Sequence, residues 1–573
     1  MAGFDDVSLG RSVRRFFEVI RLEKKEVSAI YFFAILSGLI QLSLPLGIQA
    51  IINFAQAAVG QSKLPASMWL LIVLVVLGVL AAGVLQVGQM RVVEKIQQRI
   101  FARYSLEFAF KIPRFKAKDT DPFHLPELVN RFFDTVSLQK ALSKLLLEVP
   151  LAMIQILFGL ILLSLYNPVF IILGILLLTI LYVVLYYTSK PGLAASFRES
   201  GYKYDLASWI EELARTYKSF KVGSRHNLHL KKTDQILGGY IDARTEHFYV
   251  LKFQYWSLIV FKLLITAAML IIGALLLIDQ QLNLGQFIAA EIVIITVLAA
   301  VEKLILSLDK AYDVLTSLEK LNVVTEQTLE TSGNLEFRKI PEGISIEASN
   351  LAFGYTDNSK TLENIQFKIT PGSKVCVMGV LASGKSTLLD LLTGCLEPDE
   401  GSLLVNGIPV KNYELESYRK EIGVFYHDQD IFEGSLIENI TMGNDSISID
   451  EIMQLLDIVG LKNYISNLPN GFESELKPGG KGLSSLISKK ILLARAFAGS
   501  PSLLVLDEPF EMAAGDHGSL ILKYLLGLKN TTVVVATGDM NYARSADQLI
   551  YMENGKIKYI GKPDEVEKKL RGN

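Results

Sequence analysis

Six apolar segments, each long enough to cross a bilayer, constrain the fold of this chain more than any other feature. They cover roughly residues 27–57, 66–90, 147–166, 168–188, 255–279 and 285–308. Because lipid offers the peptide backbone no hydrogen-bond partner, such segments must cross as helices that pair their own N–H and C=O groups. The third and fourth segments meet at Tyr166-Asn167-Pro168, which predicts a tight hairpin. We therefore expect an all-α membrane domain, and six separate segments do not suit the alternative of a buried soluble helical core.

Basic residues are distributed unevenly between these segments. The short connections after the first, third and fifth segments contain Lys63 as their only Lys or Arg, whereas residues 91–146 and 189–254 hold eleven each. By the positive-inside rule, the long stretches and both termini are predicted to be cytoplasmic in a multi-pass membrane protein, with a bacterial cytoplasmic membrane as the expected location. The net charge of −2 argues against nucleic acid as a partner, because no basic excess exists to neutralise phosphates.

Two further features belong to the membrane half. Residues 9–25 alternate basic and apolar side chains at helical spacing, which predicts an amphipathic helix on the membrane surface or, alternatively, a solvated lead-in helix. No cleavable signal peptide and no N-terminal peptidase domain are expected before residue 27. Lys262 and Glu291 lie inside apolar segments, where charges either mark a transport path or snorkel toward a helix end. Their different depths predict that they do not pair with each other within one chain.

A phosphate-binding loop dominates the other half. Gly379-Val380-Leu381-Ala382-Ser383-Gly384-Lys385-Ser386-Thr387 fits the pattern Gly, four residues, Gly-Lys-Ser, between a predicted buried strand and a predicted helix. In that context backbone N–H groups surround a phosphate, Lys385 adds a positive charge, and the Ser386 hydroxyl can ligate Mg²⁺. The sequence therefore predicts a site for ATP and Mg²⁺ in an α/β domain.

A second element supports the same site. Leu503-Leu-Val-Leu-Asp507-Glu508 is an apolar strand that ends in two carboxylates. Asp507 is placed to hold Mg²⁺ through water, and Glu508 to polarise an attacking water molecule.

The order of these motifs resembles an ABC exporter half-transporter, in which six membrane helices are fused to one nucleotide-binding domain. The resemblance rests on Phe353-Gly-Tyr355, the phosphate loop, Gly479-Gly-Lys-Gly-Leu-Ser484, Ala494-Arg-Ala496 and Leu506-Asp-Glu-Pro509. It implies a dimer in which ATP is sandwiched between the phosphate loop of one chain and the signature sequence of the other, with Tyr355 stacked on adenine. The expected domains are an elbow segment over 1–26, a membrane domain over 27–321 with cytoplasmic helix extensions, a linker over 322–336, and a nucleotide-binding domain over 337–573.

The signature sequence departs from the family pattern. Leu-Ser-Gly-Gly-Gln of the family is here Leu483-Ser484-Ser485-Leu486-Ile487. Glycines at this place let backbone N–H groups approach the γ-phosphate closely, whereas Leu486 adds bulk there.

Other positions that the family uses around the γ-phosphate and Mg²⁺ differ as well. His427 replaces a Gln, although Mg²⁺ prefers oxygen ligands to imidazole. Gly538 stands where a switch His is expected, Glu511-Met-Ala-Ala514 replaces a Ser-Ala-Leu-Asp segment, and Ala382 replaces a loop glycine.

Two functions remain open on these grounds. The first is an ATP-driven exporter with slow hydrolysis, which moves a peptide or protein, a lipid or a hydrophobic compound; the pattern is nearest to exporters of type I protein secretion. The retained Glu508 favours this function. The second is a nucleotide-binding membrane subunit that does not pump, which the changed signature, His and Gln positions favour. Expected partners are a second half-transporter, identical or different, the lipid bilayer and a periplasmic adaptor protein.

Overall fold

The computed structural model describes residues 9–57, 66–120, 125–223, 226–356, 359–510 and 516–571. These residues form two compact units. One comprises Met1–Pro113 with Phe123–Gln327, and the other comprises Arg114–Pro122 with Thr328–Asn573. The nine-residue segment Arg114–Pro122 therefore belongs to the second unit, although the residues before and after it belong to the first.

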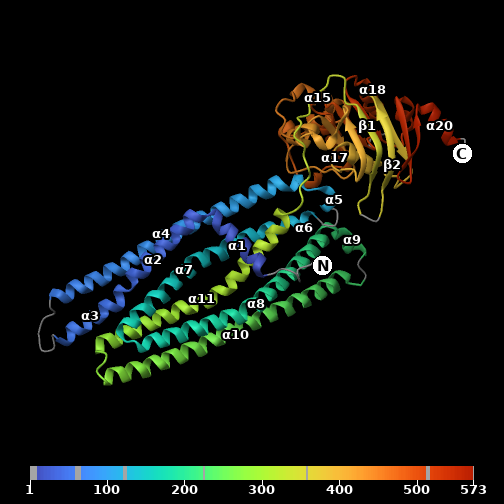
Figure 1. The fold of residues 1–573 in the computed structure, drawn as a ribbon. Helices are drawn as coiled ribbons and strands as arrows, with labels where there is room; N and C mark the ends of the chain where they lie inside the picture. Colours follow the sequence, from blue (N-terminus) through green and yellow to red (C-terminus); the bar gives the residue numbers. More distant parts are fainter. Residues whose placement is uncertain are drawn as a thin grey trace. The chain divides into compact units, whose positions relative to one another are not determined.

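The first unit is all helical, and its long helices lie side by side (Figure 1). The strongest packing joins α11 to α7, α10 to α8, and α2 to α4. The helices are α1 (Leu9–Leu22), α2 (Lys24–Gln41), α3 (Ser43–Ala57), α4 (Ala66–Lys111), α6 (Leu125–Asn130), α7 (Asp134–Tyr166), α8 (Val169–Arg215), α9 (Tyr217–Gly223), α10 (Leu228–Ile278) and α11 (Leu284–Thr325), with short 3₁₀ turns at Ile112–Arg114 and Arg131–Phe133.

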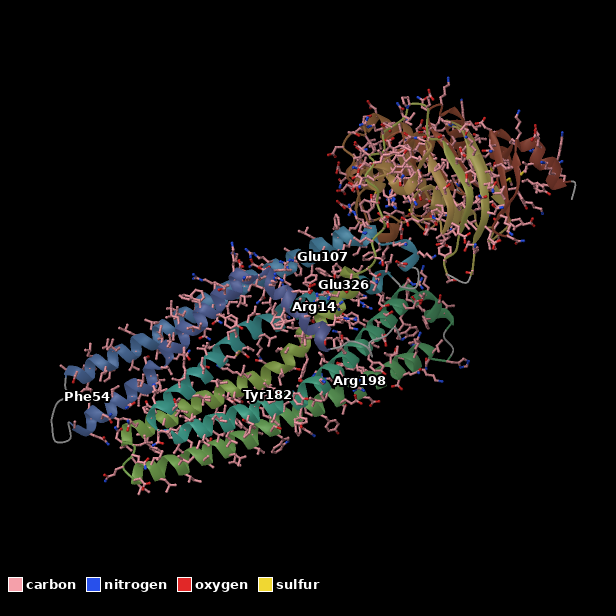
Figure 2. All side chains as sticks on the ribbon, viewed as in Figure 1. Arg14, Phe54, Glu107, Tyr182, Arg198 and Glu326 are labelled. Atoms are coloured by element: carbon pink, nitrogen blue, oxygen red, sulfur yellow. The ribbon has the colours of Figure 1, made fainter. Side chains whose placement is uncertain are left out.

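Six helical stretches among the described residues are long and apolar enough to span a membrane, which confirms the predicted number. The hairpin at residues 166–168 is confirmed as well, since α7 ends at Tyr166 and α8 begins at Val169. Apolar side chains such as Phe54 and Tyr182 point outward from this unit, and they are 43% and 66% exposed (Figure 2). Such exposure suits a surface covered by lipid.

The first membrane segment is broken, which the sequence pattern did not predict. α2 ends at Gln41 and α3 begins at Ser43, so Leu42 separates two helices. The cause is Pro45, which has no N–H to donate to the carbonyl of Gln41 four residues earlier. A window of continuous apolar residues does not reveal this interruption.

The second unit is an α/β domain with a six-stranded sheet and a four-stranded antiparallel sheet. The first has the order β12-β11-β3-β10-β9-β6, and all but β12 run parallel; the second has the order β2-β1-β4-β5. The strands are β1 (Ile346–Phe353), β2 (Leu362–Ile369), β3 (Lys374–Gly379), β4 (Glu400–Val405), β5 (Ile408–Pro409), β6 (Ile422–Phe425), β7 (Gly434–Ser435), β8 (Glu475–Leu476), β9 (Leu503–Asp507), β10 (Thr532–Ala536), β11 (Gln548–Glu553) and β12 (Lys556–Gly561). The helices are α5 (Ala117–Thr120), α12 (Lys385–Leu392), α13 (Leu415–Arg419), α14 (Leu436–Thr441), α15 (Ile449–Ile458), α16 (Lys462–Ser466), α17 (Ser485–Phe497), α18 (Asp516–Gly527), α19 (Met540–Ser545) and α20 (Pro563–Arg571).

The C-terminal ends of the parallel strands β3, β10 and β9 lie side by side in the sheet. Ala536 of β10 lies opposite both Val377 of β3 and Asp507 of β9. Because parallel strands end on the same side, the residues after Val377, Asp507 and Ala536 are neighbours, although the sequence separates them widely. Apolar cores on both faces of this sheet hold the three strands in place.

Candidate nucleotide site

The phosphate loop joins β3 to α12, as the sequence predicted. Its backbone is left-handed at two residues, Gly384 with φ 94° and Ala382 with φ 60°. Glycine adopts this conformation freely, but alanine in it costs about 1–2 kcal/mol. The loop is thus built with strain at Ala382, the position where the family has glycine.

The first two side chains of α12 supply polar groups to the site. The Lys385 ammonium donates to the carbonyls of Gly379 and Val380 at 3.0 and 3.2 Å, which holds it above the loop. The Ser386 hydroxyl donates to Asp507 Oδ2 at 3.1 Å. Burial raises the pKa of Asp507, while the hydrogen bond from Ser386 and the charge of Lys385 oppose that rise. One hydroxyl and one carboxylate side by side are oxygen ligands of the kind that Mg²⁺ prefers, so these residues fit that ion.

Glu508 follows Asp507 and turns sharply out of the strand, with φ 49°. Its Oε2 accepts hydrogen bonds from Thr537 Oγ1 at 2.8 Å and from the backbone N–H of Gly538 at 3.3 Å. The end of β10 therefore orients the carboxylate. The sequence did not point to Thr537, although a threonine at the end of an apolar strand next to the expected switch position was the available signal.

Tyr355 stands beside the first turn of α12. Its hydroxyl lies 3.3 Å from Thr387 Oγ1, and its ring packs edge-on against Phe353 at 5.1 Å between centroids. The residue is 36% exposed.

The altered signature forms the start of α17. Ser484 caps this helix by accepting from the N–H of Ile487 at 3.2 Å, and Leu483 packs against the core. Leu486 is 45% exposed on the first turn. In the part of the chain that the structure describes, residues 483–487 make no hydrogen bond or ion pair with the phosphate loop.

The other altered positions lie around the two carboxylates. His427 is exposed, and its Nδ1 lies 3.5 Å from the ammonium of Lys489. A positive charge on His427 would lower the pKa of Asp507. A Cβ added to Gly538 would meet no atom within 4 Å. The segment 511–514 lies outside the described residues. Lys489 is a further cation near this site that the motif pattern did not indicate.

The two intramembrane charges do not meet each other, in agreement with their predicted depths. Lys262 of α10 instead forms an ion pair with Glu302 of α11. The count of two charges inside the apolar segments was wrong, since four more ionisable residues lie within their bounds, namely Glu148, Asp279, Glu302 and Lys303. Glu291 has a buried Oε1 without a hydrogen-bond partner.

Comparisons with known proteins agree with this architecture. Residues 27–301 match the family described as ABC transporter transmembrane region, and residues 362–511 match the family described as ABC transporter. A multidrug resistance ABC transporter ATP-binding and permease protein of Lactococcus lactis is 30% identical over 39% of this chain and 38% of its own length. The alpha-hemolysin translocation ATP-binding protein HlyB of Escherichia coli O157:H7 is 28% identical over 51% of this chain and 42% of its own length. The chain thus matches about two fifths of the length of these curated relatives.

The whole fold also matches a solved structure. A bacterial Atm1-family ABC exporter with ATP bound superposes with a TM-score of 0.83 at 17% identity, over 96% of this chain and 97% of that one. The likeness confirms the predicted fold class, an all-α membrane domain of exporter type with an α/β nucleotide-binding domain. With a transmembrane region and an ATP-binding domain in one polypeptide, this chain belongs to the ABC transporter family.

Proposed function

We propose that this chain is one half of an ATP-driven exporter that works as a dimer and hydrolyses ATP slowly. The observation that carries the proposal is the geometry at the C-terminal ends of the parallel strands. Ser386 Oγ lies 3.1 Å from Asp507 Oδ2, and Glu508 is oriented by two hydrogen bonds from the residues that follow β10. A protein that only bound nucleotide would not need an oriented carboxylate next to the phosphate loop.

Each residue has a distinct role in this proposal. Backbone N–H groups of the loop and the Lys385 ammonium bind the phosphates, and Tyr355 stacks on the adenine. Ser386 and Asp507 would hold Mg²⁺, which supplies charge neutralisation at the β- and γ-phosphates. Glu508 accepts a proton from the attacking water.

Slow hydrolysis follows from what surrounds these residues. Gly538 offers no imidazole to the γ-phosphate, and His427 offers nitrogen where an oxygen ligand is expected. Removal of one preorganised transition-state contact typically lowers the rate by ~10²–10³-fold. Among the described residues, the signature forms no hydrogen bond or ion pair with the phosphate loop of its own chain, which supports a sandwich made by two chains, identical or different.

The remaining features of the proposal come from the family and from charge. The exporter would lie in a bacterial cytoplasmic membrane with both termini in the cytoplasm, and a periplasmic adaptor would be a further partner. Its substrate would be a peptide or protein, a lipid or a hydrophobic compound. Lys262, Glu302 and Glu291 are candidates for the transport path, because charged groups inside a membrane domain usually serve function.

A second function competes with this one. The side chain of Leu486 projects from the first turn of α17, where a partner's γ-phosphate would need close approach to backbone N–H groups. That observation favours a nucleotide-binding subunit that does not pump.

ATPase measurements on the purified protein in lipid separate the two functions. The exporter proposal expects slow phosphate release that Glu508→Gln abolishes. Release that is indistinguishable between the wild type and this variant, with ATP bound in both, would favour the subunit that does not pump.

A further inference from the structure

A polar cavity of about 480 Å³ lies between α7, α8, α10 and α11 in the membrane unit. All its lining residues lie outside the apolar segments, and two of them stand close to the segment ends. Lys144 precedes the segment that begins at residue 147, and Lys310 follows the one that ends at residue 308. At the helical rise of 1.5 Å per residue these positions are within about 5 Å of the segment ends. The cavity thus reaches the ends of the apolar segments and continues along the helix extensions.

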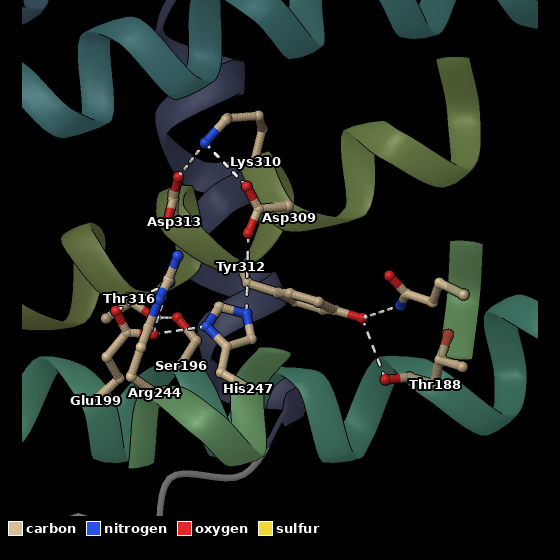
Figure 3. Close-up of polar contacts among 11 residues, drawn as sticks. Thr188, Ser196, Glu199, Arg244, His247, Asp309, Lys310, Tyr312, Asp313 and Thr316 are labelled. Atoms are coloured by element: carbon tan, nitrogen blue, oxygen red, sulfur yellow. Dashed lines mark hydrogen bonds and ion pairs between the residues drawn. The ribbon is translucent and has the colours of Figure 1, made fainter. Parts of the chain in front are cut away.

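The acidic residues that line the cavity already have cationic partners (Figure 3 draws the second and third pairs). They are Asp134 with Lys203 at 3.7 Å, Glu199 with Arg244 at 3.0 Å, and Asp313 with Lys310 at 2.8 Å. The Lys310 ammonium also forms an ion pair with Asp309, which does not line the cavity, at 3.0 Å. Each lining carboxylate therefore already balances the charge of one lining cation.

Two cations of the wall remain without a carboxylate. The cavity is lined by five Lys or Arg side chains and three Asp or Glu side chains, an excess of two positive charges. The two are Lys140 and Lys144, which form no hydrogen bond or ion pair with any described residue. They stand four residues apart on α7, so their side chains are neighbours and repel each other. An anion bound between them would convert this repulsion into two attractive contacts.

Two buried polar atoms of the wall also lack a hydrogen bond. Ser200, 7% exposed, has an unpartnered Oγ, and His247, 2% exposed, has an unpartnered Nε2. The other ring nitrogen of His247 lies 2.7 Å from Glu199 Oε2, and Nε2 lies 3.8 Å from Asp309 Oδ1, too far for a hydrogen bond (Figure 3). Buried polar atoms normally have partners, so a bound group with acceptor and donor oxygens suits this wall.

We propose that this cavity binds an anion through a phosphate group, which Lys140 and Lys144 hold by charge and Ser200 by a hydrogen bond. Lysine ammonium groups bind phosphate as point charges, and a monohydrogen phosphate also carries an O–H that can donate to His247 Nε2. Either a soluble phosphate or the headgroup of a lipid such as phosphatidic acid offers this chemistry. That the anion is a transported substrate rests on the proposed function, whereas its binding does not.

Binding is tested with the full chain in the Lys385→Ala background, which removes the phosphate loop as a competing site. In one arm, inorganic phosphate is titrated by calorimetry into protein in phosphatidylcholine nanodiscs. In the other, native mass spectrometry counts phosphatidic acid retained by the detergent-solubilised protein. Saturable binding of phosphate alone identifies a soluble anion, and retention of phosphatidic acid that phosphate displaces identifies a lipid headgroup.

The variants locate the site. Lys140→Gln with Lys144→Gln should weaken binding about tenfold, since two close charges are lost, while Lys140→Arg with Lys144→Arg should retain it. The matched control is Lys24→Gln with Lys25→Gln, an exposed basic pair outside the cavity, which should change binding less than about twofold. If the glutamine pair does not fold, Ser200→Ala should by itself weaken binding about tenfold. Absence of saturable binding in both arms, or equal weakening by the control pair, would overturn the proposal.

Discussion

Restoring the missing γ-phosphate contacts should raise ATP hydrolysis. The variant combines Gly538→His with Ser485→Gly, Leu486→Gly and Ile487→Gln. The structure accommodates the histidine, because a Cβ at position 538 meets nothing within 4 Å and the residue has no left-handed backbone. The backbone N–H that donates to Glu508 is kept, so the new side chain adds an imidazole without removing an existing contact.

The changes in the signature are mild for stability. Ser485 and Leu486 are the first residues of α17, and Ser484, which caps the helix, is unchanged. Glycine costs about 1 kcal/mol per residue in a helix interior and less in the first turn, so we expect a loss of about 1–2 kcal/mol. Leu486 is already 45% exposed, so its removal sacrifices little buried apolar surface.

The expected gain in rate is larger. One transition-state contact is worth up to ~3 kcal/mol, which corresponds to about 10²-fold in rate. Two repaired contacts are not additive, and we therefore expect the combined variant to release phosphate at least ~10²-fold faster than the wild type. The assay is phosphate release by the purified protein in nanodiscs at saturating Mg-ATP.

Two controls make this test specific. Gly538→Ala adds the Cβ without the imidazole and should leave the rate unchanged. Glu508→Gln in the repaired protein should remove the gain, because only the carboxylate can accept the proton of the attacking water. The reasoning is refuted if the wild type already turns over at ~10 s⁻¹, or if the repaired protein binds ATP and shows no gain.

Four other outcomes are expected. Lys385→Ala should abolish the rise in thermal midpoint that Mg-ATP causes, and an unchanged rise would place the nucleotide elsewhere. Lys262→Leu should lower the thermal midpoint by leaving Glu302 unpaired in the membrane, and adding Glu302→Leu should restore it; failure of the double variant to recover would show that the pair is not coupled. Burial raises the pKa of Asp390 to about 6, above that of the unfolded chain, so this residue destabilises the fold as pH rises from about 4 to 6 and above. Asp390→Asn should therefore be more stable than the wild type at pH 7, by about 1–2 kcal/mol after allowance for partial exposure, with no difference at pH 4, as measured by thermal unfolding across pH. Cysteines placed at Lys63 and Asn283 should react with a membrane-impermeant reagent from outside the cell, and labelling only from the cytoplasmic side would reverse the topology.

Local patterns predicted much of this molecule. The turn at Asn167-Pro168, the lengths of the apolar segments and the strand–loop–helix around Lys385 each depend on neighbouring residues, and each is found in the structure. The adjacency of Ser386 and Asp507 was also predicted, because the roles of both residues in one phosphate site require it.

Contacts between distant residues were harder to predict. The hydrogen bond from Thr537 to Glu508 depends on the register of β10 against β9, and the sequence of either strand alone does not fix that register. The pairing of Lys262 with Glu302 depends on how α10 and α11 rotate against each other. The cavity near Lys140 is lined by residues of four helices. Its excess of positive charge is therefore found only when each carboxylate has been assigned to the cation that it contacts in the structure.

The break at Leu42 has a mechanical consequence. α4 runs for 46 residues without interruption and transmits a push along its axis as a stiff rod, whereas the first membrane segment consists of rods of 18 and 15 residues joined by one residue. The N–H of Leu42 donates to the carbonyl of Leu39 at 3.2 Å and its carbonyl accepts from the N–H of Leu46 at 3.3 Å, so a single residue carries the backbone contact between the two rods. A change of tilt between the two halves of this segment would therefore be concentrated at Leu42, beside Pro45, and not spread along a continuous helix.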